Sequence, residues 1–252
     1  MEHGSLYTHT QNGIATLEFY HPASNSLPSD LLQRMVKSFN ELSESKEVKV
    51  IVLKSEKDRV FCAGASFDEL LKIDNTKDGV AFFSGFGSLV NAMRKCKKPI
   101  IGRVQGKVVG GGVGIVAACD YAMATEQAAI KLSEISIGIG PFVVEPAIRR
   151  KIGVGAVSEL SLNPAMWQNA YWAKEKGLYA RIFDTTKDLD KEIQILSEQL
   201  ASYSTEAVQH LKKVLWEGTE NWDTLLTERA NICGNLVLSK TTKEALLKFK
   251  NN

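Results

Sequence analysis

Three consecutive glycines, Gly110 to Gly112, stand between two apolar segments of different character. The segment before them, residues 100–104 between Pro99 and Gly106, is rich in β-branched side chains and predicts a strand. The segment after them, residues 113–118, has small and apolar side chains and predicts the start of a buried helix. A glycine turn from strand to helix exposes backbone N–H groups at the positive end of the helix dipole. Such a turn can bind an anion, or an oxygen that becomes anionic during a reaction.

Two common nucleotide-binding glycine motifs do not fit this turn. A P-loop closes with Gly-Lys-Ser/Thr, whereas Gly106-Lys107 is followed here by Val108. A dinucleotide fingerprint needs G-x-G-x-x-G with an acidic residue roughly 20 positions on, and Gly110 to Gly114 depart from that spacing. The simpler alternative is that the glycines only allow a helix and a strand to pack closely.

A second junction of the same kind lies earlier in the chain. Residues 60–63 are short and apolar and predict a strand, and Gly64 allows a turn. Ser66 can then cap a helix whose apolar face begins at Phe67. Two such junctions in one sheet could direct their N–H groups at one oxygen, so together they are more informative than either alone.

The composition indicates an ordinary water-soluble domain. The chain has 252 residues, 44% hydrophobic and 24% charged, which suits one domain or one large domain with a small appendage. Its formal net charge of +2 gives no reason to expect nucleic acid or a membrane surface as a partner. The amino-terminal residues lack an apolar signal core, and no apolar run reaches membrane length. We therefore expect a cytoplasmic protein.

The cysteines and histidines do not form a metal or disulfide pattern. The four cysteines have no C-x-x-C spacing and no paired histidines, which predicts reduced thiols and no metal site. They are Cys62, Cys96, Cys119 and Cys233. A nucleophilic Cys62 would need a base, but the four histidines are remote in sequence from both junctions. They are His3, His9, His21 and His210.

The order of the predicted elements indicates an α/β fold. Residues 5–19 predict an edge hairpin that turns at Asn12-Gly13, and a helix is expected to open at Pro28. A strand over residues 48–53 follows, and the strand at residues 100–104 comes later. Strands that alternate with helices are typical of a largely parallel sheet.

Two motifs and their spacing carry a family resemblance. The segments Phe61-Cys-Ala-Gly-Ala65 and Gly106-Lys-Val-Val-Gly-Gly-Gly-Val-Gly-Ile-Val-Ala-Ala-Cys-Asp120 resemble the enoyl-CoA hydratase/isomerase (crotonase) superfamily. The similarity runs from about Ile14 through Ala173-Lys-Glu-Lys-Gly-Leu-Tyr179 into the helical tail. It implies a spiral core of ββα turns, an acyl-CoA thioester as substrate, and coenzyme A only as part of that substrate, with no separate cofactor.

The resemblance also implies roles for individual residues. The backbone N–H groups of Ala65 and Gly111 would form an oxyanion hole for the thioester oxygen. The coenzyme A portion would lie along neighbouring residues, mainly against their backbone groups. These are Ala63, Ser66, Phe67, Asp68 and Gly110.

Glu134 lies between Leu132 and Ile135, just ahead of a glycine-rich turn. From the residues alone, an exposed carboxylate at a strand end is the simpler interpretation. The resemblance implies instead that Glu134 is a catalytic glutamate. A carboxylate in an apolar pocket has a raised pKa, which suits proton transfer at carbon.

One departure from the family pattern bears on the reaction. Similar hydratases carry a second glutamate two residues after the glycine triplet, where this chain has Gly114. Members with one glutamate resemble Δ3,Δ2-enoyl-CoA isomerases, in which one base moves a proton between C2 and C4. Glu145 is a possible second carboxylate, although Pro146 indicates that it starts a helix. Isomerisation is therefore the leading hypothesis, with hydration of a 2-enoyl-CoA next, and thioester hydrolysis, decarboxylation or a non-catalytic acyl-CoA binder as rivals.

The carboxyl-terminal part predicts helices over 156–162, 169–176, 189–203, 205–216, 222–238 and 242–250. We expect a core over residues 1–190 and a helical region over 191–252. The resemblance implies that such tails pack between subunits, in a homotrimer or hexamer. Phe82, Phe83, Phe86 and Phe142 are candidates for the walls of the acyl pocket.

Overall fold

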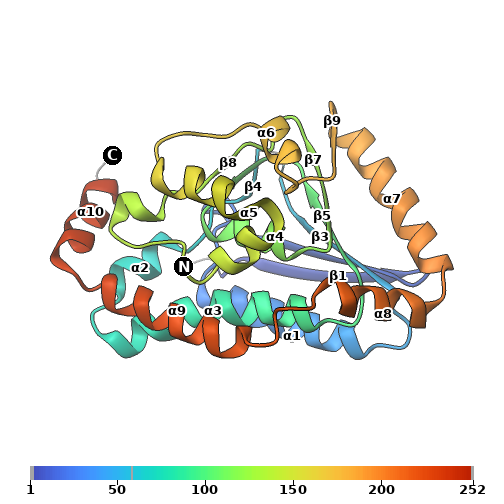
Figure 1. Ribbon diagram of the computed structural model, residues 1–252, viewed down its shortest axis with the longest axis horizontal. Coiled ribbons are helices and arrows are strands. Elements are labelled where there is room, and N and C mark those ends of the chain that lie inside the picture. Colours follow the sequence, from blue (N-terminus) through green and yellow to red (C-terminus); the bar gives the residue numbers. More distant parts are fainter. Residues whose placement is uncertain (1–2, 58, 251–252) are drawn as a thin grey trace.

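The computed structural model describes residues 3–57 and 59–250 and holds two sheets (Figure 1). The larger sheet has the strand order β1-β2-β3-β5-β7-β9, and the smaller has the order β4-β6-β8. The hairpin β1–β2 is antiparallel, and the remaining pairs of neighbours are parallel. The strands are β1 (Ser5–Gln11), β2 (Ile14–Tyr20), β3 (Val50–Ser55), β4 (Val60–Cys62), β5 (Ile100–Val104), β6 (Lys107–Val109), β7 (Tyr121–Thr125), β8 (Ile130–Lys131) and β9 (Arg181–Phe183).

Successive strands alternate between the two sheets. β3, β5 and β7 belong to the larger sheet, and each is followed by a short strand of the smaller one, namely β4, β6 and β8. A helical segment follows each pair: α2 (Phe67–Lys72), α4 (Gly111–Ala118) and the 3₁₀ helix η1 (Glu134–Ile137), respectively. The chain thus winds as a spiral of ββα turns, which confirms the predicted α/β fold.

The amino-terminal hairpin forms as predicted, with Asn12 and Gly13 both at positive φ in its turn. β1 lies at the sheet edge and is largely exposed, whereas the apolar residues 50–53 of β3 are buried. A parallel strand covered on both faces favours such a continuous apolar run.

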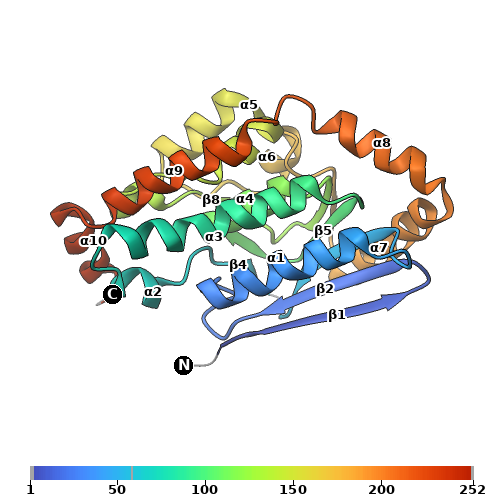
Figure 2. The ribbon, with the colours of Figure 1, turned by 90° about the horizontal axis from the view of Figure 1, so that it is seen from below.

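Three long helices form a layer beside the larger sheet (Figure 2). They are α1 (Ser29–Glu44), α3 (Thr76–Lys95) and α9 (Trp222–Leu236). α1 buries its apolar face, and Asn75 caps α3 by accepting a hydrogen bond from the N–H of Asp78. α3 and α9 approach closely at Gly79, where a Cβ would lie 2.8 Å from the carbonyl oxygen of Gly234.

The helix α5 (Glu145–Leu162) contains a break at Gly153, where φ is +75°. The sequence predicts a helix that starts near Pro146 and a separate helix over 156–162, and the break lies between them. A positive φ is easily adopted by glycine and interrupts regular helix geometry.

The remaining carboxyl-terminal helices are α6 (Ala170–Glu175), α7 (Thr186–Ser202), α8 (Thr205–Leu215) and α10 (Lys240–Lys250). α7 packs on the larger sheet through Leu189 and Ile193, so the predicted boundary between residues 190 and 191 falls inside this helix. α7 and α8 lie at one end of the molecule, and α10 lies at the other, against α2 and η1 (Figures 1 and 2).

Candidate active site

The two glycine turns predicted from the sequence lie in contact. β4 and β6 are parallel neighbours, with Cys62 opposite Val108, so the turns that follow them emerge at the same end of the small sheet. Gly64 has a φ of +85°, and a Cβ at this position would lie 2.9 Å from the carbonyl oxygen of Val109 and 3.4 Å from the nitrogen of Gly111. Both its conformation and the close approach favour glycine here.

Each turn presents a backbone N–H group without an acceptor. Within residues 3–57 and 59–250, no hydrogen bond uses the N–H of Ala65 or of Gly111. Gly111 is the first residue of α4, where the N–H groups lack intrahelical partners and the helix dipole is positive. Ala65 and Gly111 both line one cavity, which therefore has two donors available for an oxygen.

Glu134 enters the same cavity from a third ββα turn. It is the first residue of η1, after β8, and a Cβ at Gly110 would lie only 2.9 Å from its Oε1. Its Oε2 is buried and has no hydrogen-bond partner among the described residues. Burial raises the pKa of the carboxyl to about 7. The interpretation of Glu134 as an exposed carboxylate at a strand end is therefore wrong.

Apart from these groups and Ser133, which precedes Glu134, the described side chains that line the cavity are apolar. It has a volume of about 210 Å³, and Glu134 is the one charged side chain among its described lining residues. The larger apolar side chains come from α2, α3, β6, η1, the segment after η1, and α9. They are Phe67, Leu70, Phe83, Phe86, Val109, Ile137, Ile139, Pro141, Val143, Val144 and Cys233.

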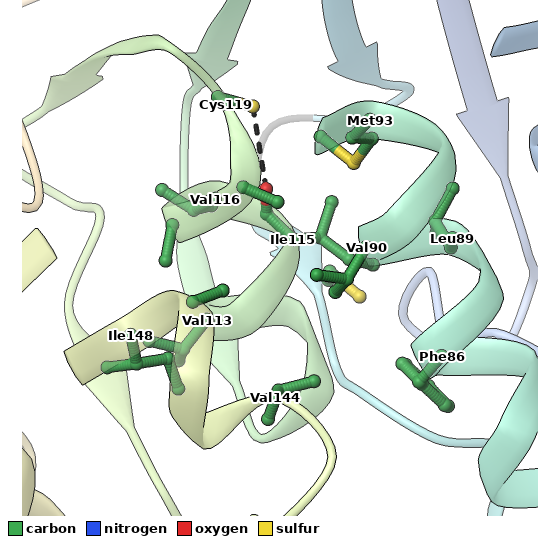
Figure 3. Close-up of a cluster of buried hydrophobic side chains, with 14 of the residues drawn as sticks. Phe86, Leu89, Val90, Met93, Val113, Ile115, Val116, Cys119, Val144 and Ile148 are labelled. Atoms are coloured by element: carbon green, nitrogen blue, oxygen red, sulfur yellow. Dashed lines mark hydrogen bonds between the residues drawn. The ribbon is translucent and has the colours of Figure 1, made fainter. Parts of the chain in front are cut away.

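The position expected for a second carboxylate is filled by Val144. A Cβ at Gly114 would lie 2.3 Å from the Cβ of Val144 and 2.5 Å from its Cγ1. Figure 3 shows Val144 beside Val113 of α4, within the buried cluster that joins α3, α4 and α5. A side chain at Gly114 is therefore incompatible with Val144 in its present position.

Comparison with known proteins agrees with this geometry. A sequence model described as enoyl-CoA hydratase/isomerase matches residues 9–251. The chain belongs to the enoyl-CoA hydratase/isomerase family. Relatives in this family include the peroxisomal Delta(3,5)-Delta(2,4)-dienoyl-CoA isomerase of Arabidopsis thaliana, 27% identical over 78% of this chain and 74% of the relative. The short-chain-enoyl-CoA hydratase of Clostridium acetobutylicum is 25% identical over 99% of this chain and 95% of the relative.

Solved structures of the family share the fold. The enoyl-CoA hydratase of Bacillus halodurans superposes with a TM-score of 0.89 over 96% of this chain and 99% of that protein, at 19% sequence identity. The predicted crotonase-type core is thus confirmed. At these identities the relatives differ among themselves in the reaction they are named for, so the family alone does not assign one.

The residues singled out by family resemblance fall into two groups. Ala63, Ala65, Phe67, Gly110 and Gly111 line the cavity with Glu134. The other predicted site residues do not line it. Ser66 caps α2 by accepting a hydrogen bond from the N–H of Glu69, and Asp68 is exposed in the first turn of that helix. Glu145 starts α5, with its carboxylate 4.0 Å from the guanidinium group of Arg149.

Of the four phenylalanines proposed as pocket walls, Phe83 and Phe86 line the cavity, and Phe82 and Phe142 do not. Sequence reasoning missed Leu70, Val143, Val144 and Cys233 as lining residues. Helical periodicity indicates that Leu70 and Cys233 are buried, but it does not indicate which cavity they face.

The thiols of this enoyl-CoA hydratase/isomerase family member are poor nucleophiles. Burial raises the pKa of both Cys62 and Cys233 to about 12, so both stay protonated near neutral pH. None of the four histidines lines the cavity. Across the described part of the chain, no cluster of His, Cys, Asp or Glu could hold a metal ion, and no helix is long and apolar enough to cross a membrane.

Proposed function

We propose that this protein moves the double bond of a 3-enoyl-CoA thioester to the 2-position, with Glu134 as the single proton carrier. Coenzyme A belongs to the substrate, and the reaction needs no further cofactor. The thioester oxygen accepts hydrogen bonds from the N–H groups of Ala65 and Gly111, and the acyl chain enters the apolar cavity beside Glu134.

The proposed reaction has two proton transfers. The carboxylate of Glu134 removes a proton from C2, and the electron pair of that C–H bond moves into a dienolate whose charge lies on the thioester oxygen. The same carboxyl group returns the proton to C4, the C3–C4 double bond is lost, and a C2–C3 double bond forms. Each oxyanion donor contributes roughly 3–4 kcal/mol to stabilising such an oxygen, by analogy with oxyanion holes of other enzymes. A carboxyl pKa of about 7 suits both removal and return of the proton near neutral pH.

The observation that carries this proposal is the contact between Gly114 and Val144. Hydration by paired carboxylates needs one group to activate water and another to protonate the α-carbon. A Cβ at Gly114 would lie 2.3 Å from the Cβ of Val144, so the second group has neither a side chain nor space. Among the residues that the structure describes, Ser133 is the one other polar side chain that lines the cavity, and no second carboxylate lies there to activate a water molecule. These features favour transfer of a proton over addition of water.

Hydration of a 2-enoyl-CoA is the second candidate. The Clostridium acetobutylicum relative, which aligns with 99% of this chain, is named as a short-chain-enoyl-CoA hydratase. In this reaction Glu134 would act through a water molecule held by backbone groups.

Two other rivals are less well supported. Covalent thioester hydrolysis would require an ionised thiol, and burial holds the pKa of Cys62 at about 12. A purely binding role does not account for the Oε2 of Glu134, because a buried carboxylate oxygen without a partner destabilises the fold.

We also propose that the chain assembles as a homotrimer or hexamer. Several large apolar side chains are exposed on the isolated chain, which supports assembly through a subunit interface. They include Leu162 at the end of α5, Met166 and Trp167 after it, and Leu211, Val214 and Leu215 on α8.

The test is a paired assay on purified protein. Wild type, Glu134→Gln and Glu145→Gln are each given 3-hexenoyl-CoA and crotonyl-CoA. Glu145 is the matched control because its carboxylate lies outside the cavity, 4.0 Å from Arg149. We expect isomerisation by wild type and Glu145→Gln, a loss of at least ~100-fold in Glu134→Gln, and no hydration by any of them. Hydration of crotonyl-CoA that is lost in Glu134→Gln would favour the second candidate instead.

A further inference from the structure

The cavity has no positive charge in its walls. Within residues 3–57 and 59–250, no lysine, arginine or histidine lines it, and the carboxyl of Glu134 is the one ionisable acid there. A carboxylate in an apolar environment needs a cation or several hydrogen-bond donors to offset its lost hydration. This cavity places its two free N–H donors at the thioester end, where Ala65 and Gly111 lie.

Phe83, Val143 and Cys233 line the cavity with packed apolar side chains, and we refer to them as its far wall. Val143 lies against α3 and α9, since a Cβ at Gly87 would be 3.4 Å from both the Cγ1 of Val143 and the Cβ of Leu226. The Sγ of Cys233 on α9 donates to the carbonyl oxygen of Gly140 at 3.7 Å, so this thiol is already paired. Phe83 on α3 completes this wall and is 7% exposed. The far wall therefore offers hydrocarbon and no free donor side chain to an incoming group, and the one hydroxyl among the described residues that line the cavity belongs to Ser133, next to Glu134 in the chain.

We propose that the cavity selects uncharged acyl groups and rejects acyl groups that end in a carboxylate. This inference rests on the proposed function for the identity of the ligand as an acyl-CoA thioester. A terminal carboxylate would lose its hydration against Phe83, Val143 and Cys233 without gaining a partner. The ionised carboxylate of Glu134 would also repel it within the same cavity of low polarity.

The experiment compares two saturated thioesters of equal chain length, hexanoyl-CoA and adipoyl-CoA. They differ in whether the last carbon is a methyl or a carboxylate, and neither needs to be turned over to bind. Dissociation constants are measured by titration calorimetry with wild-type protein at pH 8. We expect adipoyl-CoA to bind at least ~30-fold more weakly, and a smaller ratio would overturn the inference.

The outcomes separate this inference from the proposed function. Similar binding of both thioesters would overturn the selectivity and leave the isomerase proposal standing. Selective binding without isomerisation of 3-hexenoyl-CoA would support the selectivity and contradict the proposed reaction. Failure of both thioesters to bind would overturn both.

A charge placed in the far wall tests where the selectivity arises. Phe83→Arg introduces a cation on a side chain long enough to reach the cavity, and Phe83→Leu is the matched control with an apolar side chain. We expect Phe83→Arg to reduce the hexanoyl-to-adipoyl affinity ratio by at least ~5-fold, whereas Phe83→Leu keeps the wild-type ratio. An unchanged ratio in a folded Phe83→Arg protein would contradict the assignment of selectivity to this wall. The wild-type ratio decides the main inference even if Phe83→Arg fails to fold.

Discussion

The Glu134→Gln substitution is expected to change the free energy of unfolding more favourably above pH 7 than at pH 5. Burial raises the pKa of this carboxyl from 4.5 to about 7. Between these two values the folded protein keeps the proton and the unfolded chain has released it. The free energy of unfolding of the wild type therefore falls as the pH rises through this window, and the loss is complete above about pH 7.

The size of the effect follows from the same pKa. One pKa unit is worth about 1.4 kcal/mol, so a rise from 4.5 to about 7 corresponds to about 3.5 kcal/mol. Glutamine does not ionise, and its free energy of unfolding lacks this pH dependence. The buried amide itself adds an offset of about 1–3 kcal/mol, but that offset does not change with pH. The informative quantity is therefore how much the difference in free energy of unfolding between the two proteins changes from pH 5 to pH 8.5.

The assay is urea unfolding of wild type and Glu134→Gln from pH 5 to pH 8.5, at one protein concentration because assembly affects apparent stability. Glu145→Gln is the control, since its carboxylate is outside the cavity. We expect the Glu134→Gln curve to gain about 2.5 kcal/mol on the wild-type curve over this range, because part of the total effect falls below pH 5. Parallel curves would refute the conclusion that burial raises the pKa of Glu134.

Three further predictions concern the packing of the site. Gly114→Glu alone should destabilise the fold by at least ~1–3 kcal/mol through overpacking, because a Cβ at this position would lie 2.3 Å from the Cβ of Val144. Adding Val144→Gly should restore the stability measured by thermal unfolding. No recovery in the double variant would contradict the contact. Gly110→Ala should lower the free energy of unfolding in urea by ~1–3 kcal/mol, because φ at this position is +56°. It should also lower isomerase kcat, because a Cβ would lie 2.9 Å from the Oε1 of Glu134. Wild-type values of kcat and stability would show that the turn adapts to a side chain. Cys62→Ala should retain kcat within ~5-fold in an isomerase assay, because this thiol has a pKa of about 12 and stays protonated, whereas complete loss would revive a nucleophilic role.

The glycine junctions could be predicted from the sequence because their chemistry is local. A strand, a glycine turn and a capped helix are encoded within about ten neighbouring residues, and parallel strands bring such turns to the same end of a sheet. The cap at Ser66 and the hairpin turn at Asn12-Gly13 follow the same logic, and the structure confirms both. The strand β6 (Lys107–Val109) was not predicted, because three residues are too few to show an alternating pattern.

Features that depend on distant residues could not be predicted in this way. The local pattern around Leu132, Glu134 and Ile135 suggests buried apolar residues and an exposed carboxylate. In the structure the 3₁₀ turn instead buries the carboxylate of Glu134 and leaves Ile135 48% exposed. The contact of Val144 with Gly114 joins positions thirty residues apart, and Cys233 reaches the cavity from α9. Tertiary packing decides these contacts, and nothing in the local sequence specifies them.

In the reaction that we propose, Glu134 moves a proton within the substrate and no water is added. The most direct measurement is to incubate 3-hexenoyl-CoA with the wild-type protein in H₂¹⁸O and to follow the thioesters by mass spectrometry. We expect conversion to 2-hexenoyl-CoA of unchanged mass, with no product that contains ¹⁸O in its acyl chain. Accumulation of an ¹⁸O-labelled 3-hydroxyacyl-CoA at a rate comparable to that of isomerisation would contradict the proposed reaction.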